Sequence, residues 1–312
     1  MGNFITINII QTALEVGLVY SLVALSLFIS FSILNICDLS TDGCYTLGCA
    51  VGAVVTIAGH PFLAVILAMA AGICSGYITA FLQTKLGVQS ILAGIIVNTG
   101  LYTINLAVMG FSSNVSIFGK DTIFSLFGGL WDSSFWKSWH KLILLGLIVG
   151  LICLVILRFL STRLGLSIRA TGDSPAMIRA SSINPSFTIT IGLCIGGALT
   201  ALAGCLIGIY NKSCDINLGT GMVTIALASL IIGESISGKR NMTKRVICVV
   251  LGSCLYRFVI SLALRLNVPT EAFKLVSALI VAVAIAAPKV KQTILLNKKK
   301  KAAIAMRSNG GN

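Results

Sequence analysis

Charged residues are scarce in this sequence. Asp, Glu, Lys and Arg together make up 10% of the 312 residues, against roughly 25% in soluble domains. Hydrophobic residues reach 56%, and the mean hydropathy is +0.99. This composition excludes a water-soluble fold and leaves no room for a sizeable soluble catalytic domain.

Histidine and paired cysteines are also lacking. The chain has two histidines, His60 and His140, and none of its 10 cysteines forms a CxxC pair. Because a zinc site needs several such ligands at suitable spacing, we expect no metal and no cofactor. Most cysteines lie within apolar runs, where we interpret them as small packing residues.

Acidic residues are few, 9 against 23 Lys and Arg, so the formal net charge is +14. Such a charge can indicate nucleic-acid binding. Here the basic residues sit in short segments between apolar runs and in the terminal tail, which is typical of membrane orientation. We therefore expect membrane lipid, and no nucleic acid, as a partner.

Long apolar runs fill most of the chain. Since a helix needs about 20 mostly apolar residues to span a bilayer, they predict an all-α fold, a polytopic transmembrane bundle of about eight to ten spans. The second run is short and rich in Gly, as a partial helix would be. Nine runs are counted, at residues 7–33, 43–59, 62–83, 90–110, 141–160, 187–210, 220–236, 246–265 and 271–287. The predicted organisation is a transmembrane domain over 1–288 and a basic tail over 289–312.

The Lys and Arg bias of short loops sets the orientation. If the basic tail is cytoplasmic, alternation places Lys85, the 158–186 segment and the 239–245 loop on the same side. The amino terminus then lies outside, and the carboxyl terminus lies in the cytoplasm.

Glycines spaced four apart recur within the runs, and this spacing lets helix backbones approach closely in lipid. The pairs are Gly48 and Gly52, Gly72 and Gly76, Gly146 and Gly150, Gly192 and Gly196, and Gly204 and Gly208. They predict a tightly packed bundle and say nothing about a substrate.

Two segments, SILNICDLSTDG (32–43) and GIYNKSCDINLGTG (208–221), share a Cys-Asp pair followed by Gly at the end of a run. On the predicted topology they point in opposite directions, as an inverted repeat requires. Chance similarity is the other explanation.

The segment Gly233–Arg240, GESISGKR, differs by one residue from the phosphate-binding GxxxxGK[ST] loop. Arg240 stands where the loop needs the hydroxyl that holds magnesium. The segment also ends an apolar run instead of joining a strand to a helix. We therefore predict that the chain binds no nucleotide and is not itself an enzyme.

A polar loop, LGLSIRATGDSPAMIRASSINP, covers residues 164–185. Asp173 or Ser174 can cap a helix that starts at Pro175. Pro185 prevents its continuation. The loop therefore predicts a short cytoplasmic helix from Pro175 to about residue 182, with Met177, Ile178 and Ser181 on one face.

Several short motifs of the sequence resemble the permease subunits of ATP-binding-cassette importers in the branched-chain amino acid, ribose and nucleoside superfamily. They are LSIRATGDSP (166–175), MIRA (177–180) and GGALTALAG (196–204). Residues 34–43, 85–95, 99–110 and 269–274 are similar to a bacterial subfamily thought to serve amino acids, including tryptophan and tyrosine. The family usually has Gly where this chain has Ser182.

The resemblance implies that the 161–186 segment couples the chain to a separate ATPase subunit. The coupling residues it implies are Arg169, Gly172, Asp173, Ser174, Pro175, Met177, Ile178, Arg179, Ser181 and Ile183. It also implies an extracytoplasmic substrate-binding lipoprotein, a second permease copy in a homodimer, and a location in the bacterial cytoplasmic membrane.

Polar residues within spans are costly in lipid and usually face protein or a water-filled path. The candidates for a translocation path are Glu15, Asn35, Asp38, Asp42, Asn98, Asn105, Asn211 and Glu234. Each could instead bridge two helices by a hydrogen bond, and we expect Arg257 to pair with one of the acids. A secondary transporter or channel that works alone is the alternative function.

Overall fold

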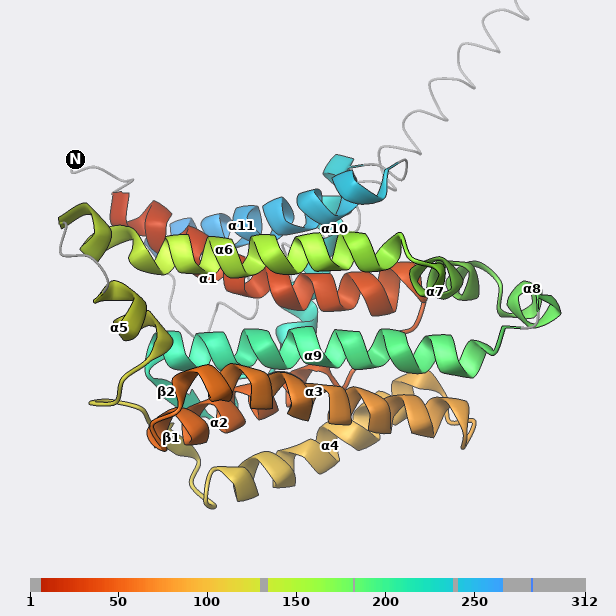
Figure 1. Cartoon of the computed structure of the whole chain (residues 1–312), viewed down its shortest axis with the longest axis horizontal. Coiled ribbons are helices and arrows are strands. Elements are labelled where there is room, and N and C mark those ends of the chain that lie inside the picture. Colours follow the sequence, from red (N-terminus) through yellow and green to blue (C-terminus); the bar gives the residue numbers. More distant parts are fainter. Residues whose placement is uncertain (1–6, 130–133, 182, 238–240, 266–281, 283–312) are drawn as a thin grey trace, which may run out of the picture.

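Long apolar helices run side by side through the structure (Figure 1). The computed structural model describes residues 7–129, 134–181, 183–237, 241–265 and 282. Among these, six helices are long and apolar enough to cross a membrane. They are α1 (Ile7–Leu27, extended by the π-helix η1, Phe28–Ile33), α3 (Pro61–Thr84), α4 (Ser90–Val108), α6 (Ser134–Leu160), α9 (Pro185–Asn211) and α11 (Met242–Arg265). The ninth predicted run and the basic tail lie outside the described residues.

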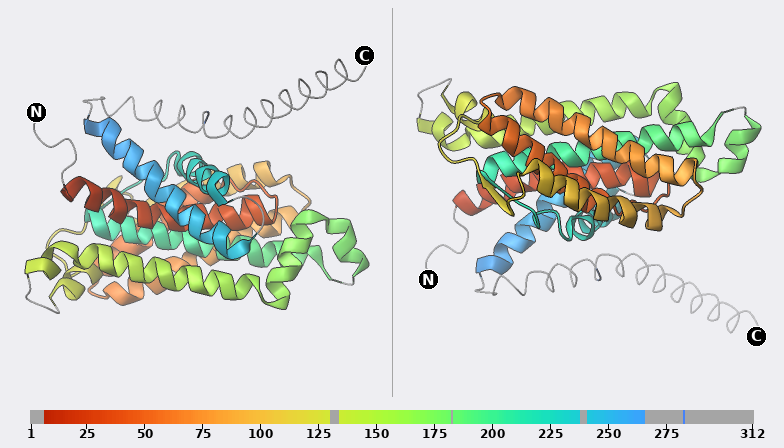
Figure 2. Two further views of the ribbon diagram at one scale, coloured as in Figure 1. Left: turned by 90° about the horizontal axis from the view of Figure 1, so that it is seen from above. Right: turned by 90° about the horizontal axis from the view of Figure 1, so that it is seen from below.

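Helix α9 lies at the centre of the bundle, with α1, α6, α10 and α11 on one side and α2, α3 and α4 on the other (Figures 1 and 2). Helices α1 and α9 are mostly buried, whereas α3, α4, α6 and α11 expose most of their apolar surface. An apolar surface of this extent belongs against lipid.

Two helices are too short to cross a bilayer on their own. Helix α2 (Thr41–Ile57) follows a non-helical stretch over 34–40, and α10 (Met222–Ser237) follows another over 212–221 that contains only a short strand. The Cys44 thiol of α2 donates to the carbonyl of Gly197, halfway along α9, at 3.4 Å. Helix α2 therefore begins inside the bundle, as the short, Gly-rich run indicated.

The two halves of the chain repeat one arrangement in opposite directions. Helix α3 runs antiparallel to α9, with Gly72 opposite Gly197 and Gly76 opposite Leu193. Helix α11 of the second half runs antiparallel to α1 of the first half, as α3 does to α9. The Ser253 hydroxyl of α11 donates to the carbonyl of Gly17 in α1 at 3.1 Å.

The two Cys-Asp segments also fold alike. The Asp38 carboxylate accepts from the backbone N–H of Ser40 at 2.9 Å, and Asp215 accepts from Asn217 at 2.7 Å. Each aspartate carboxylate thus accepts from the N–H two residues later, an Asx turn, in the non-helical stretch before a short helix. Together with the helix directions, this similarity favours the inverted repeat over chance.

Close backbone packing holds α2 against α9. Gly48 faces the main chain of Ala201, and Gly204 faces the main chain of Tyr45, so a Cβ atom at either position would collide with backbone. The prediction is wrong for Gly146 and Gly150, because no atom of the described residues lies within 4 Å of a Cβ built at either. Gly146 is half-buried and Gly150 is exposed, so the spacing alone does not reveal a partner helix.

The polar loop is mostly helical. The segment folds into helices α7 (Arg163–Asp173) and α8 (Pro175–Ala180). The expectation of a loop over 164–174 is therefore wrong. The Thr162 hydroxyl accepts from the backbone N–H of Gly165 at 3.3 Å and caps α7. Gly165, Ile168 and Thr171 recur every three residues and bury one face of α7, a pattern that the polar composition of the segment concealed.

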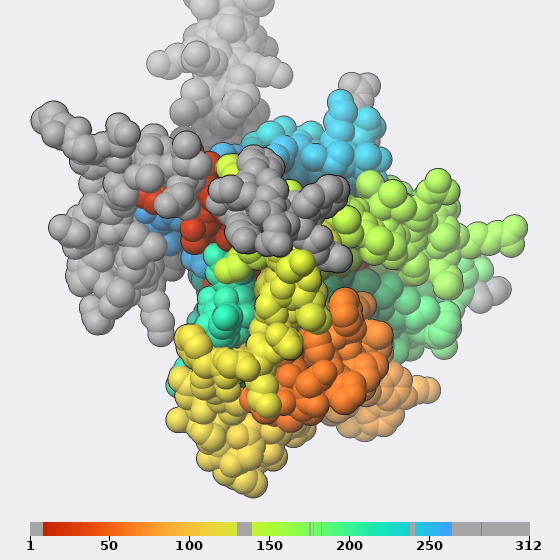
Figure 3. All heavy atoms as spheres, turned by 60° about the vertical axis from the view of Figure 1, so that its left-hand side comes forward, coloured from red at the N-terminus to blue at the C-terminus, as the bar shows by residue number. Residues whose placement is uncertain are grey.

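The end of the bundle opposite α7 and α8 is covered by small elements. Strand β1 (Asn114–Ser116) pairs antiparallel with β2 (Ser213–Asp215), and α5 (Ile123–Gly128) follows. In Figure 3 the yellow segment that contains β1 and α5 lies between the orange α3 region and the teal end of α9. The amino-terminal end of α1 lies at this same end (Figure 1).

Two matched glycine substitutions test the packing. Gly48→Ala should lower the stability of the protein by about 1–3 kcal/mol, because its methyl group enters the backbone of α9. Gly146→Ala should instead be neutral or stabilise by up to about 1 kcal/mol, because alanine is the better helix former and has open space there. The measurement is the thermal midpoint of the purified protein by size-exclusion chromatography after heating. Equal midpoints for the two variants would contradict the close contact of α2 with α9.

Candidate functional site

A polar cavity of about 320 Å³ lies where α2 begins. Helices α2 and α4 and the stretch before α10 form its walls. The residues that line it are Asp42, Gly43, Thr46, Asn98, Thr99, Tyr102, Asn105, Ile216, Asn217, Gly219 and Thr220. Because Asn98 lies halfway along α4, the cavity sits near mid-depth in the bundle and draws on both halves of the repeat.

Asp42 joins the two halves at this level. Its carboxylate oxygens accept from the backbone N–H groups of Gly221, at 3.0 Å, and Val223, at 2.9 Å. These N–H groups belong to the start of α10, where the helix has no partners of its own for them. Thr46 adds a second link, because its hydroxyl accepts from the N–H of Gly219 at 3.2 Å.

Asn105 is almost fully buried in the cavity wall, with 1% of its surface exposed. Its amide nitrogen donates to the carbonyl of Gly43 at 3.1 Å, while its Oδ1 has no hydrogen-bond partner among the described residues. The half-buried Asn98 lies directly against Gly43, which has no side chain at that point. These two amides give the cavity polar groups that the protein does not fully use itself.

The structure brings together three of the predicted path residues, Asp42, Asn98 and Asn105, and places the others elsewhere. Glu15 is buried in the first half of α1, where it accepts from Gln11 at 2.9 Å and from the Tyr210 hydroxyl at 2.8 Å. Such bonds within and between helices match the alternative that we left open for these residues.

Two further candidates shape the chain before α2. Asn35 is exposed and has a positive φ of 58°, which suits the turn that ends η1. The carboxylate of Asp38 is bonded to the N–H and hydroxyl of Ser40. Asn211 lies exposed at the end of α9.

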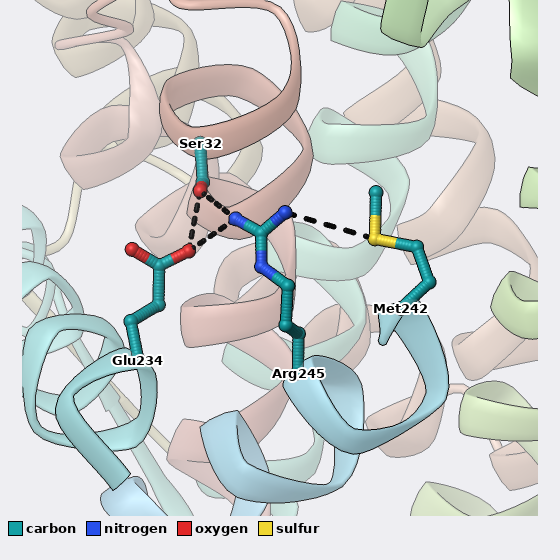
Figure 4. Close-up of polar contacts among 4 residues, drawn as sticks. All are labelled: Ser32, Glu234, Met242 and Arg245. Carbon is teal, nitrogen blue, oxygen red and sulfur yellow. Dashed lines mark hydrogen bonds and ion pairs between the residues drawn. The ribbon is translucent and has the colours of Figure 1, made fainter. Parts of the chain in front are cut away.

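Glu234 lies at the junction of η1, α10 and α11 (Figure 4). Arg245 Nη2 donates to its Oε1 at 2.5 Å and to the Ser32 hydroxyl at 2.6 Å, and Ser32 also donates to Glu234. The Arg245 guanidinium stands 5.0 Å from the ring centroid of Phe28. This cluster ties three helices together and does not line the cavity.

Arg257 does not pair with an acid among the described residues. Its guanidinium carbon lies 4.2 Å from the ring centroid of Tyr20 instead. A cation above an aromatic face is an alternative to an ion pair that the sequence could not distinguish.

Sequence reasoning missed most of the cavity, including five polar residues: Thr46, Thr99, Tyr102, Asn217 and Thr220. A hydroxyl or amide side chain on its own carries no signal for a site. Four of the five lie in 99–110 and 208–221, two segments that we singled out in the sequence, whereas Thr46 lies in neither.

The near P-loop has the wrong geometry within its described part. Residues 233–237 are the last turn of α10, and Gly233 packs against the main chain of Cys248 and Val249 in α11. A phosphate-binding loop needs free backbone N–H groups, which a helix interior does not offer. Residues 238–240 lie outside the described residues.

The predicted coupling residues lie at the end of the bundle that α8 occupies (Figure 1). Asp173, Arg179 and Ser181 are exposed, whereas Arg169, Gly172, Ser174 and Ile183 are partly buried. Ile178, which we expected on one face with Met177 and Ser181, is buried with 5% exposure, whereas Ser181 is exposed. The side chains of Pro175 and Met177 and residue 182 lie outside the described structure.

Helix α7 connects α8 to the bundle. The Thr171 and Thr188 hydroxyls share a hydrogen bond of 2.8 Å, which joins α7 to α9. Gly172 packs against the main chain of Ile33 in η1. Helix α7 therefore contacts both repeats, through η1 and through α9.

Membrane-length helices around a polar cavity at mid-depth define a membrane transport protein. The family described as the permease component of the branched-chain amino acid transport system matches residues 9–285. The chain belongs to this family, and so it is the permease component of an ATP-binding-cassette transport system and a multi-pass protein of the bacterial inner membrane.

Curated relatives match most of the chain. A tyrosine transport system permease protein of Clostridioides difficile is 32% identical over 85% of this chain and 86% of its own length. An uncharacterized protein of Rickettsia prowazekii is 32% identical over 90% and 98%, and the ribose import permease protein of Escherichia coli is 27% identical over 93% and 88%. The comparison with solved structures found no match.

Substitutions of two cavity residues, Asp42 and Asn98, should affect stability and uptake differently. Asp42→Ala removes the cap of α10, so it should lower the stability by about 0.5–2 kcal/mol and also reduce uptake. Asn98→Leu should reduce uptake and leave the stability within about 0.5 kcal/mol, because no hydrogen bond of its amide is found in the described structure. Thermal midpoints and uptake by reconstituted vesicles measure the two effects. Normal uptake by Asn98→Leu would exclude this residue from the path.

Proposed function

We propose that the chain forms the translocation path for a small polar solute, an amino acid, and that separate ATPase subunits drive the transport. The observation that carries this proposal is the polar cavity at mid-depth, which both halves of the inverted repeat build. In transporters with inverted repeats, substrates bind near the membrane midplane where short helices begin. The 32% identity to a tyrosine transport system permease protein supports an amino acid as the solute.

The ATPase subunits dock on α8 and the residues beside it, within the 161–186 segment. The exposed side chains there are those of Asp173, Ala176, Arg179, Ala180 and Ser181. Helix α7 passes a movement of α8 to η1 and α9, and the cluster of Ser32, Glu234 and Arg245 passes it on to α10 and α11. Because α10 begins at the Asp42 carboxylate, this route ends at the cavity.

A second copy of the chain covers the open side of the cavity. Thr99, Tyr102 and Thr220 are exposed there, and Tyr102 leaves 52% of its surface uncovered. The Thr99 and Thr220 hydroxyls donate to the backbone carbonyls of Ile95 and Asn217, so the Tyr102 hydroxyl is the group that would be unfavourable against lipid tails. This side therefore faces protein or a water-filled path. It supports a homodimer in which the second copy lies here, with an extracytoplasmic binding protein at the end where β1, β2 and α5 lie.

The alternative function is ion-coupled transport or channel activity without an ATPase. Buried acids within the membrane segments, Glu15 and Asp38, are the feature that favours it, since such acids can carry protons. Both acids are hydrogen-bonded in ways that explain their burial. For this reason we favour the ATP-driven importer.

The energy source separates the two functions. Vesicles that contain the permease and its copurifying subunits should take up tyrosine only when ATP is present on the α8 side. An ionophore that collapses proton and sodium gradients should change the initial rate by less than about twofold. Uptake that follows an ion gradient without ATP would establish the alternative.

Charge reversal tests the docking surface. Arg179→Glu should reduce the amount of ATPase that copurifies by tenfold or more, because an interface charge of the wrong sign costs several kcal/mol. The matched control is Lys120→Glu, an exposed charge reversal at the opposite end of the bundle, which should copurify a normal amount. Ile178→Asp is a poor test, because it would disrupt the packing of α8 itself. Normal copurification with Arg179→Glu and with Ala176→Trp would place the docking surface elsewhere.

A further inference from the structure

Several hydrogen-bond acceptors line the cavity. Asp42 contributes a carboxylate, and Asn98, Asn105 and Asn217 contribute amide oxygens. Among the described residues that line it, none is Lys, Arg or His. A solute that carries only negative charge would therefore find no opposite charge in this wall.

The atom of Asn105 that is left without a partner in the described structure is its amide oxygen, Oδ1. Its amide nitrogen donates to the Gly43 carbonyl, so the oxygen is the group left without a partner. A buried acceptor without a donor is unfavourable by about 1–3 kcal/mol in a folded protein. Well-packed proteins keep few such groups unless a ligand or a functional role compensates for them.

The Asp42 carboxylate belongs to the same cavity wall as Asn105. It has no cationic side chain as a partner in the described parts of the structure. The start of α10 balances part of its charge through two backbone N–H groups. A carboxylate can accept about four hydrogen bonds, so it retains acceptor capacity toward the cavity.

We propose that the cavity recognises the ammonium group of its solute, with Asn105 Oδ1 and the Asp42 carboxylate as the acceptors. An ammonium group brings three donors and a positive charge, which supplies what both acceptors lack. Charge-assisted hydrogen bonds are roughly twice as strong as neutral ones, so an ammonium group is favoured over the hydroxyl groups of a sugar. The inference rests on the proposed function and deepens it, since it assigns the group of the amino acid that the cavity holds.

Binding to the full-length permease in lipid nanodiscs tests this inference without any ATPase. The probes are tyrosine, tyramine, which keeps the ammonium group but has no carboxylate, and 3-(4-hydroxyphenyl)propionate, which lacks the ammonium group. Saturation-transfer-difference NMR suits the weak affinity expected of a transport site. Tyrosine and tyramine should bind, and the propionate should bind at least about tenfold more weakly.

Variants place the binding at the cavity. Asn105→Leu should weaken tyramine binding by about tenfold or more, because it removes the acceptor while keeping the number and branching of the side-chain heavy atoms. Thr56→Val, a buried change in α2 whose hydroxyl bonds only within its own helix, should bind tyramine normally. Equal binding of all three probes, no binding of tyramine, or unchanged tyramine binding by Asn105→Leu would each overturn the inference. ATP-driven uptake is measured separately, so the proposed function can fail or hold independently of this result.

Discussion

The contact between the Asp42 carboxylate and the start of α10 determines how the two halves of this permease meet. Two backbone N–H groups at a helix start would be unsatisfied inside an apolar bundle, and a carboxylate would be unfavourable there alone. Each group satisfies the other. Because α2 and α10 leave this point in opposite directions, their short lengths still reach both ends of the bundle, and the cavity opens beside their junction.

The same junction connects the cavity to the end of the protein that carries α8. The start of α10 is bound by the Asp42 carboxylate, and Glu234 lies in its last turn. Arg245 connects Glu234 to Ser32 in η1 (Figure 4). Helix α7 packs on the next residue of η1, Ile33, through Gly172. A π-helical turn is a weak point in an otherwise regular helix and is frequent at functional sites. Its position between α7 and α10 suits a segment that changes shape when partners move.

The sequence predicted the membrane class, the family resemblance, most of the helices and the helix at Pro175. Those features depend on local hydrophobicity, on proline positions and on short sequence motifs. Such signals are local, so they can be read without knowing how the helices pack. The sequence was misleading at α7, where a polar segment buries only Gly165, Ile168 and Thr171 on one face. It was also misleading at Gly146 and Gly150, because a spacing of four describes one helix, and no helix in the described part of the chain packs against these two glycines.

By itself, then, the sequence determined that this protein spans the membrane and belongs among permeases, since burying apolar residues in lipid does not depend on which helices are neighbours. Only the tertiary structure decided which polar residues share a site. Asp42, Asn98 and Asn105 form one cavity because α4 packs on α2, while Glu15, Asp38 and Glu234 find hydrogen-bond partners elsewhere. That choice rests on contacts between segments far apart in the chain, such as the 170 residues between Ser26 and Gly196, and no local pattern encodes them.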